Sequence, residues 1–347
     1  MALNYLELNG SQIEEVTLHH VGNAINGGPL KHGQNLLSLE SETLRICLLK
    51  MTSRLLSEQQ YYCFSKPSQN EVCNAVRAIF DGEELVEASQ AVATQLYNSG
   101  KHQNIKAGDF FCIRFSGAQY MKQEVDLLAF LKCETRKAFI QLDVNDAEYL
   151  PKILQGIDAD QLDKGFLVIN TDEEKGFRVL SADRTAKAKD AIFWHKDFLD
   201  IVPFQDEFLF TSEIMNVTND FVSKKVLDDF DLDRPEQLAL LDKAQKYFEN
   251  EPMFEEEKFE AAIFEDTNMR NKYRQFKSEE VAQDHYVPPN FPINNSAVQT
   301  FSKVFKSVIK LDKNFHIYVH GNRQYIERGF DEEKGKHYYK CFFDDEN

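Results

Sequence analysis

The sequence DFFCIRFSGAQYMKQEVDLLAFLKC, residues 109–133, holds two short runs rich in Phe, Ile, Leu and Val around the turn residues Ser116 and Gly117. Runs of this length bounded by turn residues are typical of β-strands. Further runs of this kind lie at 137–144, 164–170 and 177–182, and the last two flank the turn DEEKG at 172–176, which is a hairpin signal. The middle of the chain therefore predicts an antiparallel sheet.

Helical patterns precede these strands. One begins after Ser41, a residue suited to cap a helix, and places Leu44, Leu48 and Leu55 near one face. Others start near Ser68 and cover 83–98, where Gly100 follows as a typical helix terminator. We expect these helices to pack against one face of the sheet. Because strands and helices do not alternate regularly, the fold class is α+β.

The character of the sequence changes again near Val202 and Pro203. Helical patterns follow at 207–227, 235–248, 256–262 and 268–281, another starts near Asn295, and strand-like segments at 314–320, 324–330 and 337–343 close the chain. We expect an α+β N-terminal domain over residues 1–203. Residues 204–347 would form an acidic, mostly helical region that ends in a small β-meander.

Composition excludes several classes of protein. The 347 residues are 42% hydrophobic and 28% charged, which argues against collagen-like and disordered chains. The N-terminus lacks a secretory signal, and no apolar run approaches the roughly 18 residues of a membrane helix. Six scattered cysteines without a C-x-x-C pair predict reduced thiols, so neither disulfides nor structural zinc are expected. These features predict a cytoplasmic protein without a membrane partner.

The net charge of −17 argues against a simple basic nucleic-acid binder, because phosphate repels an acidic surface. The charge is unevenly distributed, however. Residues 204–266 hold 18 acidic and 6 basic side chains, so this segment carries most of the excess. The rest of the chain is therefore able to present locally positive surfaces.

Three groups of basic residues are candidates for nucleic-acid binding. They are Arg270, Lys272, Arg274 and Lys277 on one helix beside Tyr273; Lys303, Lys306 and Lys310 on a second helix; and Arg184, Lys187 and Lys189 in a loop of small residues. Arginine grips phosphate with a planar fork, and tyrosine stacks on sugar or base. The competing interpretations are solvated helix faces that pair with nearby acids, solubilising lysines, and a plain linker.

Motifs for several kinds of chemistry are absent. The sequence has no G-x-x-x-x-G-K-[ST] phosphate loop, no G-x-G-x-x-G, no H-E-x-x-H and no G-x-S-x-G. We therefore expect no cofactor and no metal. An enzyme with a dispersed active site leaves no local signature, so that hypothesis stays open beside the others.

Four stretches carry a resemblance to a known family: AFIQLDVNDAEYLPKILQGI from Ala138, GFRVLSADRTAKAKDAIFWHKDFLDI from Gly176, MFEEEKFEAAIF from Met253 and FSKVFKSVIKLDKNFHIYV from Phe301. In these stretches and in their order, the chain resembles the bacterial 37-kDa nucleoid-associated protein family. The resemblance implies a cytoplasmic protein of the nucleoid that binds nucleic acid without catalysis.

The favoured hypothesis is a non-enzymatic, nucleoid-associated protein that binds DNA through Lys and Arg contacts to phosphate, with little sequence preference and steep salt dependence. The alternative is an acidic interaction module that docks a basic, DNA-processing protein. Whether RNA competes with DNA, and whether the chain forms a homodimer, stay open at this stage.

Overall fold

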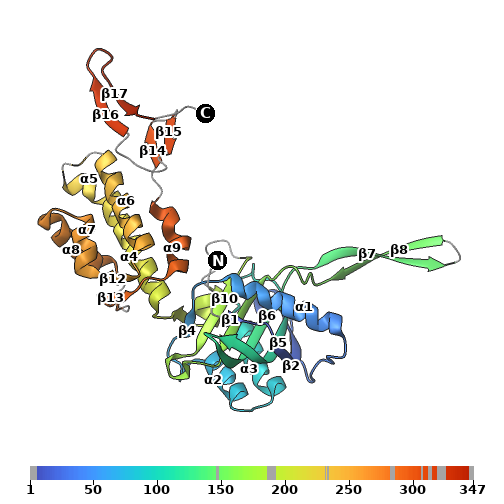
Figure 1. Cartoon of the computed structure of the whole chain (residues 1–347). Coiled ribbons are helices and arrows are strands. Elements are labelled where there is room, and N and C mark those ends of the chain that lie inside the picture. The colour runs from blue at the N-terminus through green and yellow to red at the C-terminus, as the bar shows by residue number, and fades with distance from the viewer. Residues whose placement is uncertain are drawn as a thin grey trace. The chain divides into compact units, whose positions relative to one another are not determined.

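The computed structural model describes residues 6–145, 148–185, 193–230, 232, 234–281, 286–305, 308–311, 315–318 and 326–343. The chain divides into two units between Phe204 and Gln205. Each unit has its own hydrophobic core, and Figure 1 shows the helices and strands of both.

The centre of the first unit is an antiparallel sheet in the order β11-β4-β10-β9-β6-β5-β2-β3, with β1 beside β5. Its strands are β1 (Leu6–Glu7), β2 (Gln12–Val21), β3 (Leu30–Lys31), β4 (Tyr62–Phe64), β5 (Gly108–Tyr120), β6 (Gln123–Cys133), β9 (Lys164–Ile169), β10 (Arg178–Asp183) and β11 (Ile201–Pro203). The strands predicted at 109–115, 124–133, 164–170 and 177–182 are thereby confirmed, and β9 and β10 form the expected hairpin. The α+β class is confirmed as well.

The central strands are apolar because both faces of the sheet are covered. Residues 127–133 of β6 and all of β9 are buried, and the rings of Phe130 and Phe166 stack with their centroids 4.5 Å apart. A strand that is buried on both faces reads as a continuous apolar run rather than as an alternating one. The single tryptophan, Trp194, is fully buried against the same core.

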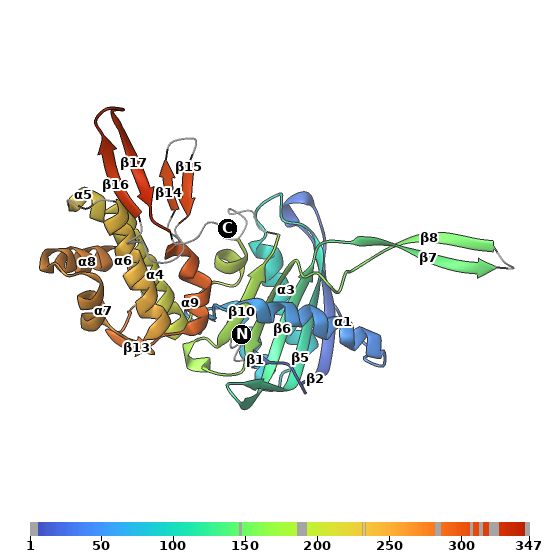
Figure 2. The same cartoon turned by 45° about the horizontal axis from the view of Figure 1, so that its top comes forward.

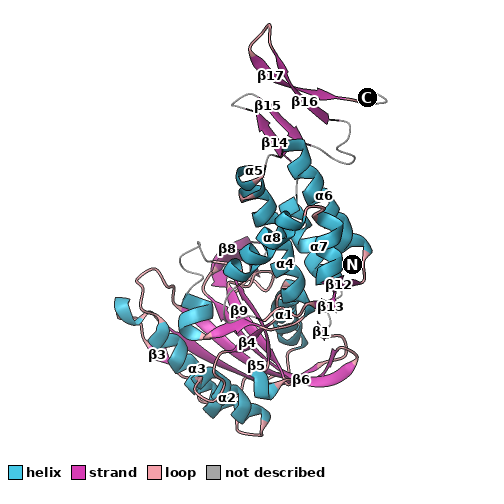
Figure 3. Cartoon of the chain, turned by 90° about the vertical axis from the view of Figure 1, so that its left-hand side faces the viewer, coloured by secondary structure: helices cyan, strands magenta, loops and turns pink. Residues whose placement is uncertain are grey.

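Helices cover both faces of the sheet, so the expectation of helices on one face was wrong. Helices α2 (Glu71–Phe80) and α3 (Leu85–Ser99) lie side by side against the face that carries Phe110 and Phe130 (Figure 3). Helix α1 (Glu42–Ser53) packs with the opposite face. Its predicted N-cap is confirmed, since Ser41 accepts a hydrogen bond from the Leu44 amide at 3.3 Å. Because adjacent strand residues face opposite ways, this sheet needs two apolar layers.

Strands β7 (Lys137–Asn145) and β8 (Glu148–Gly156) form a separate two-stranded hairpin, which we call the arm. The strand predicted at 137–144 exists, but its expected place in the main sheet was wrong. The arm extends away from the rest of the first unit in both views (Figures 1 and 2).

The second unit is built from helices around an aromatic core. They are α4 (Glu207–Lys224), α5 (Val226–Asp229), α6 (Arg234–Asn250), α7 (Glu256–Ile263), α8 (Thr267–Glu280) and α9 (Asn295–Phe301). A short pair of strands, β12 (Met253–Glu255) and β13 (Asn290–Pro292), lies among them. The helices predicted over 207–281 are confirmed, and Phe221, Phe248 and Phe259 are buried at their centre.

The end of the chain pairs as two hairpins, β14 (Val308–Leu311) with β15 (Phe315–Tyr318) and β16 (Ile326–Asp331) with β17 (Lys336–Cys341). The helix predicted from Asn295 ends earlier than expected. Helix α9 stops at Phe301, a 3₁₀ turn covers Ser302–Phe305, and residues 308–311 are a strand.

Candidate nucleic-acid interface

The basic residues predicted on α8 contact groups of their own unit. The Arg270 Nε donates to the Phe264 carbonyl at 2.6 Å, the Lys272 Nζ lies 3.9 Å from Asp229 Oδ2, Arg274 binds Glu260, and Lys277 forms an ion pair with Glu256. Glu256 and Glu260 both belong to the neighbouring helix α7. The positive stripe of α8 is therefore largely compensated by carboxylates before any ligand arrives.

The pair of Arg274 and Glu260 is the strongest of these contacts. The Arg274 Nε donates to both carboxylate oxygens of Glu260, at 3.1 and 2.8 Å, and Nη2 lies 2.6 Å from Oε2. Glu260 is 1% exposed. Tyr273 faces inward beside this pair: its hydroxyl hydrogen bonds with that of Thr218 at 2.9 Å, and burial raises its pKa. The predicted stacking role of Tyr273 was therefore wrong, because its ring belongs to the core.

The second predicted group does not form one helical stripe. Lys303 lies in the 3₁₀ turn after α9 and Lys310 in strand β14, so the two no longer share a helix. Lys306 lies outside the described residues. The expected spacing of three lysines on one helix face was wrong because the helix ends at Phe301.

The third group is only partly within the described residues, since Lys187 and Lys189 fall outside them. Arg184 follows β10 and is held by the loop after α1. Its Nη2 donates to the Arg54 carbonyl at 2.9 Å and to Ser57 Oγ at 2.8 Å, and it lies 3.2 Å from Glu58 Oε1. This guanidinium ties two parts of the first unit together.

A different positive surface emerges from two segments that lack carboxylates. Residues 16–39 and 88–108 contain neither Asp nor Glu, in a chain with 57 such residues. They carry Lys31, Lys101 and Lys106, all exposed, and none of these lysines forms an ion pair with a carboxylate of the described residues. We call the exposed parts of these two segments the acid-free surface. A search of the sequence for clustered basic residues missed this surface, although the sequence shows that both segments lack Asp and Glu.

The fold brings the two segments to one end of the sheet. Strand β3 pairs with the last residues of β2, His20 and Val21, and β5 starts at Gly108 opposite Val21. Lys31 therefore lies at the same end of the sheet as the loop 100–107 that leads into β5. Hydrogen bonds from Asn23 also hold this loop against the loop that follows β2.

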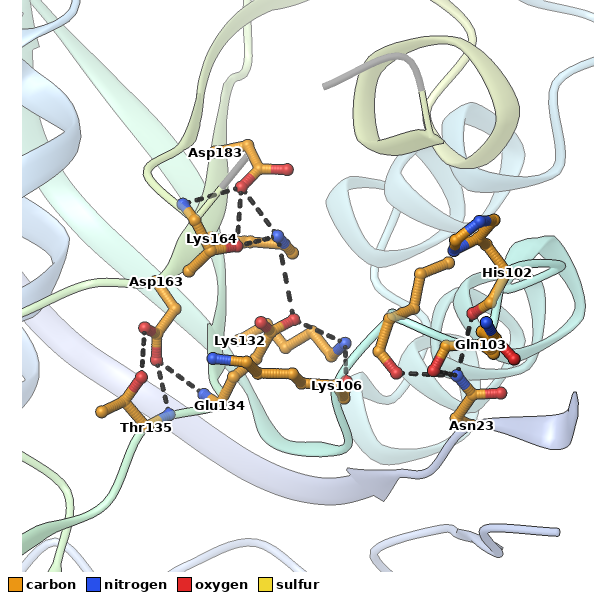
Figure 4. Close-up of polar contacts among 12 residues, drawn as sticks. Asn23, His102, Gln103, Lys106, Lys132, Glu134, Thr135, Asp163, Lys164 and Asp183 are labelled. Atoms are coloured by element: carbon orange, nitrogen blue, oxygen red, sulfur yellow. Dashed lines mark hydrogen bonds and ion pairs between the residues drawn. The ribbon is translucent and has the colours of Figure 1, made fainter. Parts of the chain in front are cut away.

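Asn23 is the residue that locks the two loops together. Its buried side chain donates to the carbonyls of His102 at 3.0 Å and Ile105 at 2.7 Å, as Figure 4 shows for His102. Its Oδ1 accepts from the Ile25 amide at 2.9 Å. A Cβ at Gly22 would lie 2.5 Å from the Pro29 carbonyl oxygen, so the turn requires glycine at this position. The loops are therefore fixed in place by buried contacts.

His19 joins the segment after β3 to helix α3. Burial and the neighbouring His32 lower the pKa of His19 to about 4, so the ring is neutral near pH 7. A neutral ring accepts at one nitrogen and donates at the other. Here Nδ1 accepts from the Gly33 amide at 3.0 Å, and Nε2 lies 3.0 Å from Ser89 Oγ.

Beneath the loop 100–107 lies a buried group of charged side chains. The Lys132 Nζ donates to the Lys106 carbonyl at 2.8 Å and to Glu134 Oε1 at 2.9 Å, and the Lys164 Nζ donates to Asp183 Oδ1 at 2.7 Å (Figure 4). The side chains of Lys132 and Glu134 are 1% and 2% exposed, and burial lowers the pKa of Lys132. The contact with its carbonyl fixes the backbone of Lys106 while the side chain of that residue stays at the surface.

Three other features were considered: a metal site, a membrane-spanning helix and a ligand pocket. Among the described residues, no group of three or more His, Cys, Asp or Glu side chains is arranged to hold a metal ion. No described helix is both long and apolar enough to cross a membrane. A polar hollow of about 520 Å³ lies beside α2 and α3, and its lining includes Asn70, Lys101 and Lys196 together with Asp197 and Asp200.

Comparison with known proteins adds a family. Residues 17–336 match the family model NA37, described as nucleoid-associated protein YejK. The match spans nearly the whole chain and both units. Among the curated proteins, none matches this chain.

Proposed function

Because the chain belongs to the NA37 family of nucleoid-associated proteins, we propose that it binds DNA at the acid-free surface, through lysine contacts to phosphate and with little sequence preference. The observation that carries this proposal is the position of Lys31, Lys101 and Lys106 in or beside two interlocked loops that contain no carboxylate. We propose a role without catalysis, exerted at the nucleoid in the cytoplasm.

Charge explains why this surface is favoured over α8. A chain of net charge −17 repels DNA at most positions, so phosphate approaches best where the cations form no ion pair with a carboxylate. On α8, DNA would have to displace Glu256 and Glu260 from Lys277 and Arg274. The acid-free surface also exposes the amides of Asn26, Gln103 and Asn104, which are side chains of the kind that contact phosphate and sugar.

The remaining predicted residues rank behind this surface. Arg184 and the α8 residues Arg270, Lys272, Arg274 and Lys277 are engaged inside their own units. Lys187, Lys189, Lys303, Lys306 and Lys310 stay predictions. The alternative role of an acidic module that docks a basic protein also stays a prediction. It ranks lower because Glu255 and Glu256 already form ion pairs with Lys258 and Lys277.

Charge reversal tests the proposal. We expect the triple variant K31E/K101E/K106E to lose binding to duplex DNA at low salt. In a separate titration, RNA of the same length serves as a competitor. Three phosphate contacts contribute a slope of about −2.7 in log affinity against log salt, which is about a 40-fold loss between about 50 and 200 mM. The measurement is binding by fluorescence anisotropy across that range.

The matched control is K243E/K246E/K258E in the second unit. These lysines already pair with Glu265, Asp242 and Glu251, so the variant makes the same change in net charge elsewhere. We expect it to retain most of the binding. Equal losses in both triple variants would attribute binding to net charge and contradict a localised interface.

A further inference from the structure

The arm exposes more apolar surface than any other hairpin described in the first unit. Its large side chains include Ile140 at 65%, Ile153 at 66% and Tyr149 at 70% exposure. A contiguous apolar patch on a protein surface marks an interaction site. An isolated two-stranded hairpin is also only marginally stable in water. Both facts indicate that something covers the arm.

The register of the arm separates its two faces. Residues that lie directly opposite each other in the two strands share a face. One face therefore carries Tyr149 and the pairs Ala138–Gln155, Ile140–Ile153 and Leu142–Pro151. We call this side the apolar face. It carries no charged side chain among these seven residues, and Gln155 and the Tyr149 hydroxyl supply its polar groups.

The opposite face is mixed: it carries polar and charged side chains together with Phe139, Leu150 and Leu154, which are 51%, 47% and 38% exposed. Lys152 forms an ion pair with Asp143, and the Gln141 amide donates to Asp143 Oδ1 at 2.9 Å. At the base, the ring of Phe139 lies 3.0 Å from the position a Cβ would take on Gly156, so this ring covers the glycine. The polar side chains of the opposite face thus have partners within the arm. The apolar face carries the four most exposed large apolar side chains described in the arm, Ile140, Leu142, Tyr149 and Ile153.

We infer that the apolar face of the arm binds the same face of a second copy of this chain. Two identical ribbons that pack face to face in opposite directions form a closed twofold contact, which is the commonest symmetry of protein oligomers. Each copy then covers the surface that the other leaves open.

The order of side chains along the apolar face fits itself in this arrangement. Opposite directions place the bulky Tyr149 near the tip of one arm over the small Ala138 and Gln155 at the base of the other. They also place the rung of Ile140 and Ile153 over that of Leu142 and Pro151. The Tyr149 hydroxyl and the Gln155 amide, the polar groups of this face, become each other's hydrogen-bond partners.

Charge also favours a second copy over a foreign protein. Two chains of net charge −17 repel each other, so they associate best through a surface that brings no like charges together. The apolar face meets this condition. A basic partner would find no carboxylate on it. Pro151 further lacks the amide donor that strand addition along the edge of β8 requires, so contact through the face is preferred to edge pairing.

The mass of the full-length protein in solution tests this inference without DNA. Sedimentation equilibrium should give twice the 40.2 kDa of one chain. The variant I140D/I153D places two carboxylates on one rung of the apolar face in each copy. We expect it to raise the dissociation constant of the dimer at least about 100-fold, because burial of four isoleucines is lost and four carboxylates are placed in an apolar contact.

The matched control is Q141D/L150D, which adds the same two carboxylates to the opposite face of the arm, where Leu150 is 47% exposed. Its dissociation constant should change by less than about 3-fold. Trp194 fluorescence in a denaturant titration shows whether each variant keeps the fold of the first unit. A wild-type protein that stays monomeric, a dimer that survives I140D/I153D, or a control that dissociates equally would each overturn the inference.

Discussion

Replacing Arg274 with alanine is expected to lower the free energy of unfolding of the second unit by about 3 kcal/mol. Glu260 is 1% exposed, and its two carboxylate oxygens both accept hydrogen bonds from Arg274. Removing the guanidinium leaves this carboxylate without that partner. An ion left without its counter-charge in a protein interior is costly. The value is at the lower end of the usual range because the Arg274 side chain is about half exposed, so water reaches the site.

Hydrogen exchange measured by mass spectrometry over α7 and α8 reports this loss, since the single tryptophan lies in the first unit. Lys272→Ala is the control and should change stability by less than about 1 kcal/mol, because Lys272 is exposed and its pair with Asp229 is long. The double variant E260Q/R274A removes both charges and should regain part of the loss. Unchanged exchange in Arg274→Ala would contradict the structural role of this pair.

The ion pair of Arg274 with Glu260 changes how charge reversal on α8 is to be interpreted. A variant in which Arg270, Lys272, Arg274 and Lys277 all become glutamate would set four new carboxylates beside Glu256 and Glu260. Loss of DNA binding in such a variant would then follow from a disrupted second unit. Lys272→Glu alone avoids the problem, because the ion pair of Lys272 with Asp229 is long, at 3.9 Å.

Replacing Lys132 with methionine is expected to destabilise the first unit by about 4 kcal/mol. Methionine keeps much of the volume but removes the ammonium group that bonds Glu134 and the Lys106 carbonyl, both in a buried setting. Lys164 lies 3.9 Å from Glu134 and compensates it only weakly. The loop that carries Lys101 and Lys106 should loosen in the same variant.

Denaturant titration followed by Trp194 fluorescence measures this effect. Lys106→Ala serves as the control, because Lys132 contacts the backbone of Lys106 and not its exposed side chain, so stability should change by less than about 0.5 kcal/mol. K132M/E134Q removes both buried charges and should recover part of the stability. Equal stability of Lys132→Met and the wild type would refute the proposed support of the loop.

Local patterns predicted the elements whose neighbours are also local. The strands at 109–115 and 124–133 and the hairpin at 164–182 follow from apolar runs between turn residues. The cap at Ser41 and the helices of the second unit follow from spacing and capping residues. In these cases the periodicity of side chains alone selects the conformation.

The errors concern partners that are distant in the sequence. Residues 137–144 alternate as a strand of the main sheet would, and nothing local tells that β7 pairs with β8 alone. The sequence around Val308 and Ile309 is compatible with a helix as well as with a strand. These residues form a strand because they pair with Tyr318 and Ile317. The spacing of Lys303 to Lys310 was misleading for the same reason.

The candidate interface shows the same division. The cations of α8 were visible in the sequence, but the partner carboxylates lie on α7, 14 residues before Arg274 and 21 before Lys277. The acid-free surface combines residues near 31 with residues near 101, which only the fold brings to one end of the sheet. The absence of Asp and Glu from residues 16–39 and 88–108 was the available signal.

Lysine acetylation footprinting with and without duplex DNA tests the central claim directly on the unaltered protein. We expect DNA to protect Lys31, Lys101 and Lys106 from acetylation and to leave Lys243, Lys246 and Lys272 as reactive as before. Protection confined to the lysines of the second unit, with Lys31, Lys101 and Lys106 fully reactive, would contradict binding at the acid-free surface.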